Sequence, residues 1–279
     1  MTSRDLGEDI PLTVVTIVKD DSIGLSVTAK SIEMQSMKPM WLVICPDAEN
    51  QTSSLAYQKL KSGVVTRIEH DAGNGIYSAM NYAISLVNQN HWLLFLNAGD
   101  TFLNENVCEQ ILVSLEGSQS KWAFGGHVKA NASGEILGAS ILNSTFKIKQ
   151  QLFAKNFVSH QAFICKVEEL RAVSGFDERY KVAADWDLMI RVALRSNGKV
   201  LPYVICVFRL GGFSTKMRHR SNYELLDLRF KYLPKSMQFL SLAWFLGRLV
   251  RNQVLIIVES ITPRFLDNLR RRKYGSKRT

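Results

Sequence analysis

Short apolar runs alternate with segments of helical periodicity in the first third of the chain. The runs at 12–18 (LTVVTIV) and 92–96 (WLLFL) consist almost wholly of β-branched, aliphatic and aromatic residues, which is typical of buried strands. Two further strand-like runs and two helical patterns lie between them. The strands are at 40–45 and 64–68, and the helices are at 25–35 and 75–88. This alternation predicts βαβ units and a mostly parallel sheet, an α/β fold.

The second half of the chain is less regular. Strands are expected at 122–128 and 162–166, and a helix is expected at 185–195. After residue 216 the composition changes to long amphipathic segments with many Lys and Arg residues. We therefore predict two parts, an α/β domain at 1–216 and a basic helical extension at 217–279.

The overall composition is that of a folded protein, with 46% hydrophobic and 22% charged residues. The first residues, MTSRDLGED, lack the apolar core of a signal peptide, so we expect a cytoplasmic protein. The four cysteines are far apart and form no Cys-x-x-Cys pair. This spacing favours buried thiols in a reducing compartment over disulfides or a zinc site.

The net positive charge of the chain comes from its C-terminal part. Residues 216–279 hold 15 Lys and Arg against 4 Asp and Glu, a net charge of +11, whereas residues 1–215 have a net charge of −1. A nucleic-acid-binding protein more often carries its basic residues on the folded domain, beside groups that contact bases. We therefore expect no nucleic-acid partner.

Six short motifs follow one another along the chain. They are DAGNGIYSAMN (71–81), FLNAGD (95–100), HQAF (160–163), GFDERY (175–180), ADWDLMIR (184–191) and GGFST (211–215). Each motif is weak alone, but the ordered series resembles the family 2 glycosyltransferases, in particular bacterial enzymes that build surface polysaccharides. The resemblance covers residues 12 to 215. It implies a GT-A fold for the α/β domain, a nucleotide-sugar donor and an inverting mechanism.

Asp100 is the expected contact to the donor diphosphate. It follows the strand at 92–96 directly, and open α/β sheets bind their ligands at the carboxyl ends of strands. The resemblance implies a D-x-D-like cluster there that holds Mg²⁺ or Mn²⁺, and this metal would neutralise the charge of the leaving diphosphate. In the matching stretch at 97–100, only Asp100 has a carboxylate, and Asn97 offers an amide oxygen as a second metal ligand. A turn without a ligand is the structural alternative.

Asp185 is the expected general base. It aligns with the second residue of the family's Glu-Asp pair, whose first position is occupied here by Ala184. A base at this place would accept the proton of the attacking acceptor hydroxyl. An aspartate at a helix start also stabilises the helix, and for the neighbouring Asp187 we expect that structural role.

Three donor-binding residues are implied by the DAGNGIYSAMN motif, namely Asp71, Gly75 and Asn81. Glycines let the backbone approach a ligand closely, and a helix N-terminus suits an anion. The Gly-x-Gly pattern here also imitates a dinucleotide fingerprint. It lacks the third glycine and does not follow the first strand, so we expect no NAD.

Three further donor contacts are implied later in the chain. His160 resembles a family residue near the donor diphosphate or the acceptor. Lys216 and Arg218 follow the glycine pair of GGFST, and a loop at this point would bring backbone amides and cations to the diphosphate. The alternatives are a structural histidine and an ordinary glycine turn.

The expected function is hexosyl transfer from a nucleotide sugar to a lipid-linked saccharide acceptor in polysaccharide biosynthesis. A UDP-sugar is the expected donor, with GDP- and dTDP-sugars as alternatives. The missing acidic residues at positions 97, 99 and 184 leave a catalytically silent binding subunit as a rival interpretation. A nucleotidyltransferase is a second rival, but it would carry a glycine-rich basic loop after its first strand.

The extension predicts a peripheral membrane protein on the inner face of the plasma membrane. Residues 236–258 are apolar, but Arg248 and Arg251 interrupt the run, and two buried arginines disfavour a membrane span. The pattern suits a helix lying in the interface, and the later RRRK cluster (270–273) would attract anionic lipid. A helix packed on the α/β domain, or on the second subunit of a homodimer, is the alternative.

Overall fold

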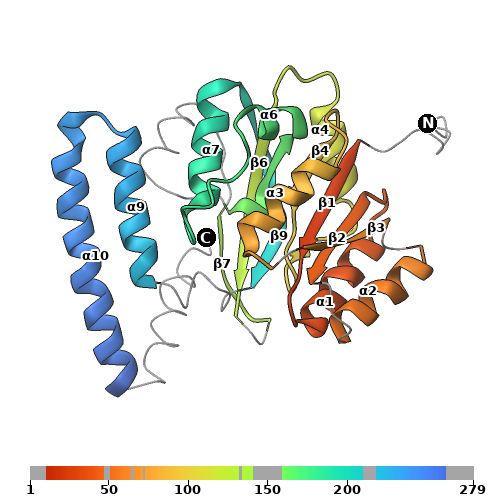
Figure 1. The fold of residues 1–279 in the computed structure, drawn as a ribbon, viewed down its shortest axis with the longest axis horizontal. Coiled ribbons are helices and arrows are strands. Elements are labelled where there is room, and N and C mark those ends of the chain that lie inside the picture. The colour runs from red at the N-terminus through yellow and green to blue at the C-terminus, as the bar shows by residue number, and fades with distance from the viewer. Residues whose placement is uncertain are drawn as a thin grey trace.

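In the computed structural model, one sheet forms the centre of the molecule and helices cover both of its faces (Figure 1). The structure describes residues 11–46, 51–63, 66–71, 73–131, 134–140, 159–209 and 218–261. Within them the sheet has nine strands in the order β3-β2-β1-β4-β8-β6-β9-β5, with β7 paired to β6. The strands are β1 (Leu12–Ile17), β2 (Met40–Pro46), β3 (Arg67–Asp71), β4 (Trp92–Phe95), β5 (Thr101–Phe102), β6 (Trp122–Ala130), β7 (Ile136–Ser140), β8 (Phe163–Lys166) and β9 (Gly198–Arg209).

The first half of the sheet is parallel, as the sequence predicts. β1 pairs in parallel with β2 and β4, and β2 pairs in parallel with β3. The second half is mixed, because β8 is antiparallel to both β4 and β6, whereas β9 is parallel to β6. β4, β6 and β9 therefore run in one direction, and their carboxyl ends lie at the same edge of the sheet. The α/β fold class predicted from the sequence is confirmed.

The helical patterns in the sequence correspond to helices α1 (Ser22–Glu33), α3 (Ile76–Leu86) and α7 (Ala184–Arg195). The strand predicted at 64–68 is β3, which begins at Arg67; residues 64 and 65 lie outside the described part of the chain. Strand β9 was missed by the sequence analysis. The remaining helices are α2 (Gln51–Lys61), α4 (Val107–Leu115), α6 (Val167–Ala172), α9 (Arg218–Tyr232), α10 (Lys235–Ile261) and the 3₁₀ turn His160–Ala162.

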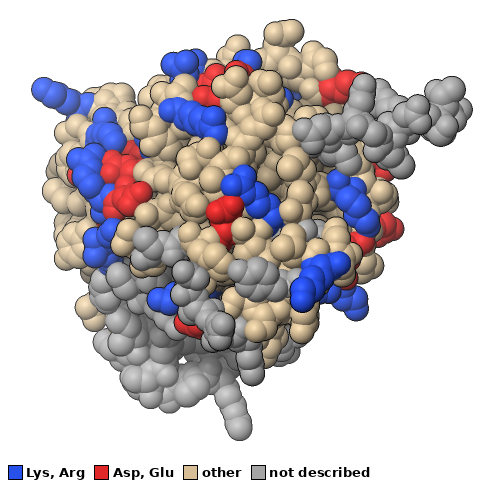
Figure 2. Space-filling model, turned by 45° about the vertical axis from the view of Figure 1, so that its right-hand side comes forward, with Lys and Arg blue, Asp and Glu red and all other residues tan. Residues whose placement is uncertain are grey.

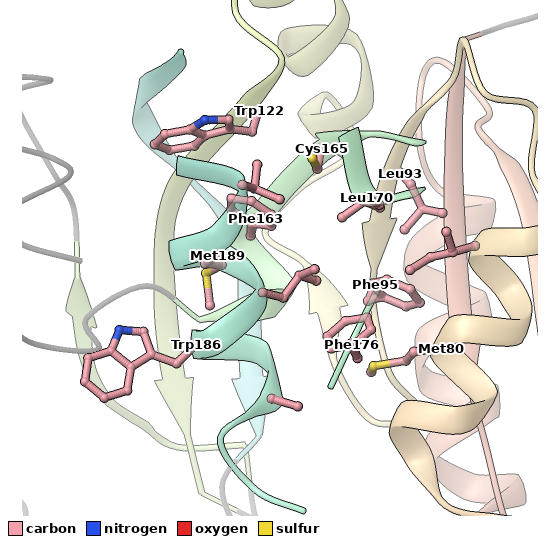
Figure 3. Close-up of a cluster of buried hydrophobic side chains, with 14 of the residues drawn as sticks. Met80, Leu93, Phe95, Trp122, Phe163, Cys165, Leu170, Phe176, Trp186 and Met189 are labelled. Carbon is pink, nitrogen blue, oxygen red and sulfur yellow. The ribbon is translucent and has the colours of Figure 1, made fainter. Parts of the chain in front are cut away.

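Two hydrophobic cores hold the layers together, one on each face of the sheet. Successive strand residues point to opposite faces, so Val14 belongs to the core under α1, α2 and α4, whereas Val15 belongs to the core under α3, α6 and α7. In the second core, Met80 of α3 approaches Phe95 and Phe176, whose ring centroids are 5.6 Å apart (Figure 3). The cysteines are buried, as predicted.

The first C-terminal helix, α9, is part of the second core, since Leu225 and Leu228 are buried there. α10 runs antiparallel along α9 at the edge of the molecule (Figure 1), with the rings of Tyr223 and Phe245 5.2 Å apart. The boundary predicted at residue 217 therefore marks a change of composition and of element type, while α9 packs with the α/β layers. Among the described residues, no helix is both long and apolar enough to cross a membrane.

The surface charges of the α/β layers are mixed. On the face shown in Figure 2, Lys and Arg side chains are interspersed with Asp and Glu side chains. This distribution agrees with the near-neutral composition of residues 1–215, whose net charge is −1.

A buried carboxylate joins α7 to α9. Asp187 is 0% exposed; it accepts hydrogen bonds from Arg191 at 2.6 Å, from Lys231 at 2.9 Å and from the Tyr232 hydroxyl at 2.6 Å. The two cations and the hydroxyl offset the cost of removing the carboxylate from water. Asp187 therefore has the structural role that its place in the helix predicts.

We predict that Asp187→Ala lowers the free energy of unfolding by about 1.5–3 kcal/mol, because it removes the buried charged acceptor of the hydrogen bonds from Arg191, Lys231 and Tyr232. Asp177→Ala is the matched control. Asp177 pairs with Arg179, whose side chain is exposed, and the loss of a surface ion pair costs about 1 kcal/mol or less. Urea unfolding of both variants tests the prediction, and equal losses would contradict it.

Candidate functional site

A cavity of about 430 Å³ opens at the edge where β4, β6 and β9 end. β8 begins at this edge because it is antiparallel to its neighbours, so the 3₁₀ turn before it also reaches the cavity. α3, the loop before α7 and the first half of α9 complete the wall. The sheet topology thus brings together segments that are far apart in the sequence. Four of the predicted site residues line this cavity, namely Asn97, Asp100, His160 and Asp185.

Asp100 lies in the turn after β4 and is 4% exposed. One carboxylate oxygen accepts a hydrogen bond from the Arg209 backbone N–H at 3.0 Å, and the other accepts one from the Gln161 side-chain amide at 2.8 Å. Burial raises the pKa of Asp100 to about 6, although these two hydrogen bonds oppose the shift. Two neutral donors fix this side chain, and within the described residues no Lys or Arg side chain forms an ion pair with it.

A chain of hydrogen bonds runs along one wall of the cavity. The Asn97 side-chain nitrogen lies 3.1 Å from Nε2 of His160, and Nδ1 of His160 lies 3.3 Å from Oδ2 of Asp185. The Asn97 amide donates to Nε2, which leaves Nδ1 of His160 to donate to Asp185. His160 therefore contacts the Asp185 carboxylate and fixes its direction.

Asp185 itself sits in the first turn of α7. Its second oxygen, Oδ1, accepts a hydrogen bond from the backbone N–H of Trp186 at 2.7 Å, and its side chain is 16% exposed. One oxygen is thus used by the helix and the other faces His160 at the cavity wall. This is a carboxylate on a rigid support that a ligand in the cavity can reach.

The oxygens at Asp100 and Asn97 fit a divalent cation. Oδ1 of Asn97 is buried and has no hydrogen-bond partner among the residues that the structure describes. The other buried acids, Asp187, Glu169 and Glu224, each pair with Lys or Arg, whereas Asp100 has no such pair within the described residues. Among the described residues, no group of three or more His, Cys, Asp or Glu side chains could hold a metal ion by itself. The donor set suits Mg²⁺ or Mn²⁺ held jointly by the protein and ligand phosphates.

Three cationic side chains also line the cavity, and the sequence analysis missed all of them. Lys129 lies near the end of β6, Arg209 ends β9, and Lys181 lies in the loop before α7. They make this edge of the sheet suitable for an anionic ligand. Lys129 directly follows the strand predicted at 122–128, and this position was the available signal, but the pairing of β6 with β9 could not be inferred from it.

Known proteins related to this chain are glycosyltransferases, although no family model matches it. An uncharacterised glycosyltransferase of Mycobacterium tuberculosis is 25% identical over 206 residues, which are 72% of this chain and 76% of the relative. The PGL/p-HBAD biosynthesis glycosyltransferase of Mycobacterium bovis is 29% identical over 125 residues. That match covers 44% of this chain and 46% of the relative, less than half of either.

Solved structures share the architecture. S. aureus TarS matches 85% of this chain with a TM-score of 0.61 and 15% identity, and the match spans 43% of the TarS chain. The mannosyltransferase PcManGT from Pyrobaculum calidifontis, in complex with GDP-Man and Mn²⁺, matches 90% of this chain with a TM-score of 0.61 and 13% identity. The chain is a glycosyltransferase homologue with the GT-A fold.

Asn81 of this GT-A homologue does not line the cavity. Its side chain holds the turn after α6, since Oδ1 accepts a hydrogen bond from Phe176 N at 2.7 Å and Nδ2 donates to Phe176 O and Glu178. Gly175 in this turn has a φ of +65°, and a Cβ there would lie 2.3 Å from Oδ1 of Asn81. The geometry thus gives Asn81 a supporting role, whereas the resemblance implies a donor contact.

Among the other predicted donor contacts, the structure describes the surroundings of Gly75. Gly75 caps α3 with a φ of +112° and lines a smaller recess of about 70 Å³ that shares Lys181 with the main cavity. Asp71 ends β3 and Arg218 begins α9, but the structure describes only their backbone. Lys216 lies outside the described residues.

Glu224 of α9 was not predicted, and it supports the segment that carries Asp185. Its carboxylate accepts hydrogen bonds from the backbone N–H groups of Lys181 (2.9 Å), Val182 (2.8 Å) and Ala183 (3.0 Å). Burial alone would raise its pKa, but these bonds and Arg220 outweigh burial, so the pKa of Glu224 is lowered. The helix after residue 217 is therefore part of the site.

We predict that Glu224→Gln speeds amide hydrogen exchange at residues 181–183 by about tenfold or more, because hydrogen bonds to a charged group contribute about 1.5–3 kcal/mol. Asp227→Asn is the matched control on the same helix. Asp227 accepts a hydrogen bond from the Tyr180 hydroxyl at 2.5 Å, whereas those amides donate to Glu224.

Exchange measured by mass spectrometry separates the two variants. Faster exchange at 181–183 in Glu224→Gln alone is the expected pattern. The same protection in wild type and Glu224→Gln would show that the carboxylate does not hold this loop.

Proposed function

We propose that this chain is an inverting hexosyltransferase that moves a sugar from a nucleotide diphosphate, a UDP-sugar in the first instance, to a hydroxyl of a lipid-linked saccharide in polysaccharide biosynthesis. The observation that carries the proposal is the hydrogen-bonded chain Asn97–His160–Asp185 beside Asp100 in one cavity. It combines an oriented carboxylate with a second carboxylate that forms no ion pair with a Lys or Arg side chain within the described residues. Transfer from a nucleotide sugar needs both, one for the acceptor proton and one for the diphosphate side.

The cavity charges support a nucleotide diphosphate as the donor. Lys129, Lys181 and Arg209 would neutralise phosphate oxygens that enter at the carboxyl ends of β6 and β9. TarS has been solved in complex with UDP and with UDP-GlcNAc, and PcManGT in complex with GDP-Man. These complexes favour a UDP-sugar and keep a GDP-sugar as the next candidate.

Asp185 would be the base of the reaction. Its carboxylate accepts the proton of the acceptor hydroxyl while the hydroxyl oxygen forms a bond to the anomeric carbon. The bond between that carbon and the diphosphate oxygen breaks, and the electron pair leaves with the nucleotide diphosphate. Because the base and the leaving group lie on opposite sides of the sugar, the product has inverted configuration. His160 would keep the carboxylate of the base oriented.

Asp100 and Asn97 would hold Mg²⁺ or Mn²⁺ through their side-chain oxygens. Such a cation neutralises the negative charge that develops on the leaving diphosphate. Asp100 is already fixed by Gln161 and the Arg209 backbone, so it offers the cation a preorganised ligand. PcManGT and GalNAc-T7 have been solved with Mn²⁺.

The two rival functions fit the site less well. A silent binding subunit would not need a histidine that orients the Asp185 carboxylate. A nucleotidyltransferase would need a basic glycine-rich loop after β1. In this chain Asp21 instead caps α1 there by accepting a hydrogen bond from Gly24 N at 2.7 Å.

We predict that Asp185→Asn lowers the rate of nucleotide release by about 10²–10⁴-fold, because the amide cannot accept the acceptor proton. Donor binding should change little, since Asp185 does not contact the diphosphate in the proposal. The measurement is turnover across UDP-, GDP- and dTDP-sugars in the presence of membrane lipid extract as the acceptor source.

Asp177→Asn is the control variant, because its carboxylate pairs with the exposed Arg179 side chain away from the cavity wall. It should keep wild-type turnover. Wild-type turnover in a normally folded Asp185→Asn variant would exclude Asp185 as the base. Donor binding without turnover by the wild type under every condition would favour the silent subunit.

We also predict that Asp100→Asn weakens Mn²⁺-dependent binding of UDP at least tenfold, since the amide keeps the size of the side chain but loses its charge. Calorimetry with Mn²⁺ and with EDTA makes the comparison, and in EDTA the variant and the wild type should bind alike. Equal binding in Mn²⁺, with turnover that persists in EDTA, would mean that Lys and Arg side chains alone neutralise the diphosphate.

A further inference from the structure

The solvent side of α10 is apolar. Phe239 is 77% exposed, Leu240 62%, Leu246 53%, Val250 64% and Val254 51%. At 100° per residue these positions, together with Leu242 and Ala243, fall on one side of the helix. We call this set of seven residues (239, 240, 242, 243, 246, 250 and 254) the α10 outer face.

The opposite side of α10 is already occupied by α9. Ser241 and Phe245 are buried there, and the Trp244 ring lies between Arg229 at 4.0 Å and Arg248 at 4.8 Å. A helix that merely covers a soluble core turns its apolar stripe inward and its polar residues to water. Here polar Ser241 and Arg248 face the protein and the larger apolar stripe faces outward, so the structure leaves that stripe without a partner among the described residues.

The charge around the α10 outer face is positive. Residues 235–254 contain no Asp or Glu, and Lys235 and Arg251 are exposed at the borders of the stripe. In the sequence that follows, residues 262–279 contain seven Lys and Arg against one Asp. A second copy of this chain would bring like charges together at such a contact, whereas an anionic lipid surface complements both the stripe and its charge.

We propose that the α10 outer face binds an anionic lipid membrane surface, with the apolar stripe in the acyl boundary and Lys235 and Arg251 at the headgroups. This binding does not depend on the sugar-transfer chemistry. It would place the cavity close to the bilayer, because Ser221 and Leu225 of α9 line the cavity while the other side of α9 packs on α10. One helix layer, roughly 10 Å thick, then separates the lipid from the site.

The test uses the full chain and three substitutions on the stripe, Phe239→Gln, Leu246→Gln and Val250→Gln. Glutamine keeps helix propensity and removes apolar contact. The matched control replaces three equally exposed apolar residues on other helices, Ile23→Gln, Val113→Gln and Leu194→Gln. Truncation at residue 216 is unsuitable, because it would remove Leu225 and Leu228 from the core.

Flotation with vesicles of phosphatidylcholine plus phosphatidylserine gives the readout. We expect the wild type and the control to float with these vesicles, and the bound fraction of the stripe variant to fall at least tenfold at unchanged melting temperature. If the triple variant melts earlier, the single variant Val250→Gln repeats the comparison. The wild type and the control variant should both float less with vesicles of phosphatidylcholine alone or at high salt.

Two results would overturn the proposal. One is equal flotation of the stripe variant and the wild type. The other is a wild type that does not float but sediments as a dimer which the stripe substitutions dissociate; that result would assign the face to a second copy of the chain.

Discussion

The Glu224 carboxylate of α9 holds the loop that leads into α7, and the site depends on this contact. Glu224 accepts three consecutive backbone N–H bonds from residues 181–183, which otherwise would be unpaired donors next to a helix start. Asp187, one turn into α7, anchors the same helix to Lys231 and Tyr232 of α9. Asp185 lies between these two anchors. The segment that carries the proposed base is thus held in place by α9, an element outside the region of family resemblance, while His160 orients the carboxylate itself.

The buried acidic residues of this protein are of two kinds, those that pair with a Lys or Arg side chain and those that do not. Asp187 and Glu224 are paired with cations and backbone donors, which makes them structural. Asp100 is also buried but accepts hydrogen bonds from neutral donors; burial raises its pKa to about 6, although these donors oppose the shift. A carboxylate kept in this state at a cavity wall is stabilised by a cation that arrives with a ligand. The unpartnered oxygen of Asn97 next to it points to the same use.

Much of the α/β domain could be predicted because the sequence patterns of its strands and helices are local. Buried strands, helix starts and polar residues at strand ends are visible in adjacent residues, so Asp100 could be expected at the carboxyl end of a strand, whereas His160 and Asp185 were expected from the family resemblance. The missed features depend on contacts between distant residues. Asn81 bonds a turn 95 residues away, and Glu224 bonds a loop about 42 residues away. β9 carries Pro202 within an apolar run, which argued against a long strand.

The C-terminal helices show the same limit in another form. Periodicity located the polar and apolar sides of residues 236–258, but it could not tell which side packs on the protein. The structure places Ser241 and Arg248 against α9 and leaves Phe239 and Leu246 exposed. Contacts with α9 determine which side of α10 faces the protein, because Arg229 stacks on Trp244 and Tyr223 packs against Phe245.

The most direct test of the account is a crystal structure of the protein with UDP and Mn²⁺. The account predicts the diphosphate in the cavity of about 430 Å³, with Mn²⁺ bound to an Asp100 oxygen and the Asn97 amide oxygen, and with Lys129 or Arg209 at the phosphates. It also predicts open space beside Asp185 for the sugar and the acceptor hydroxyl. A nucleotide bound elsewhere, or in this cavity with its phosphates away from Asp100, would contradict it.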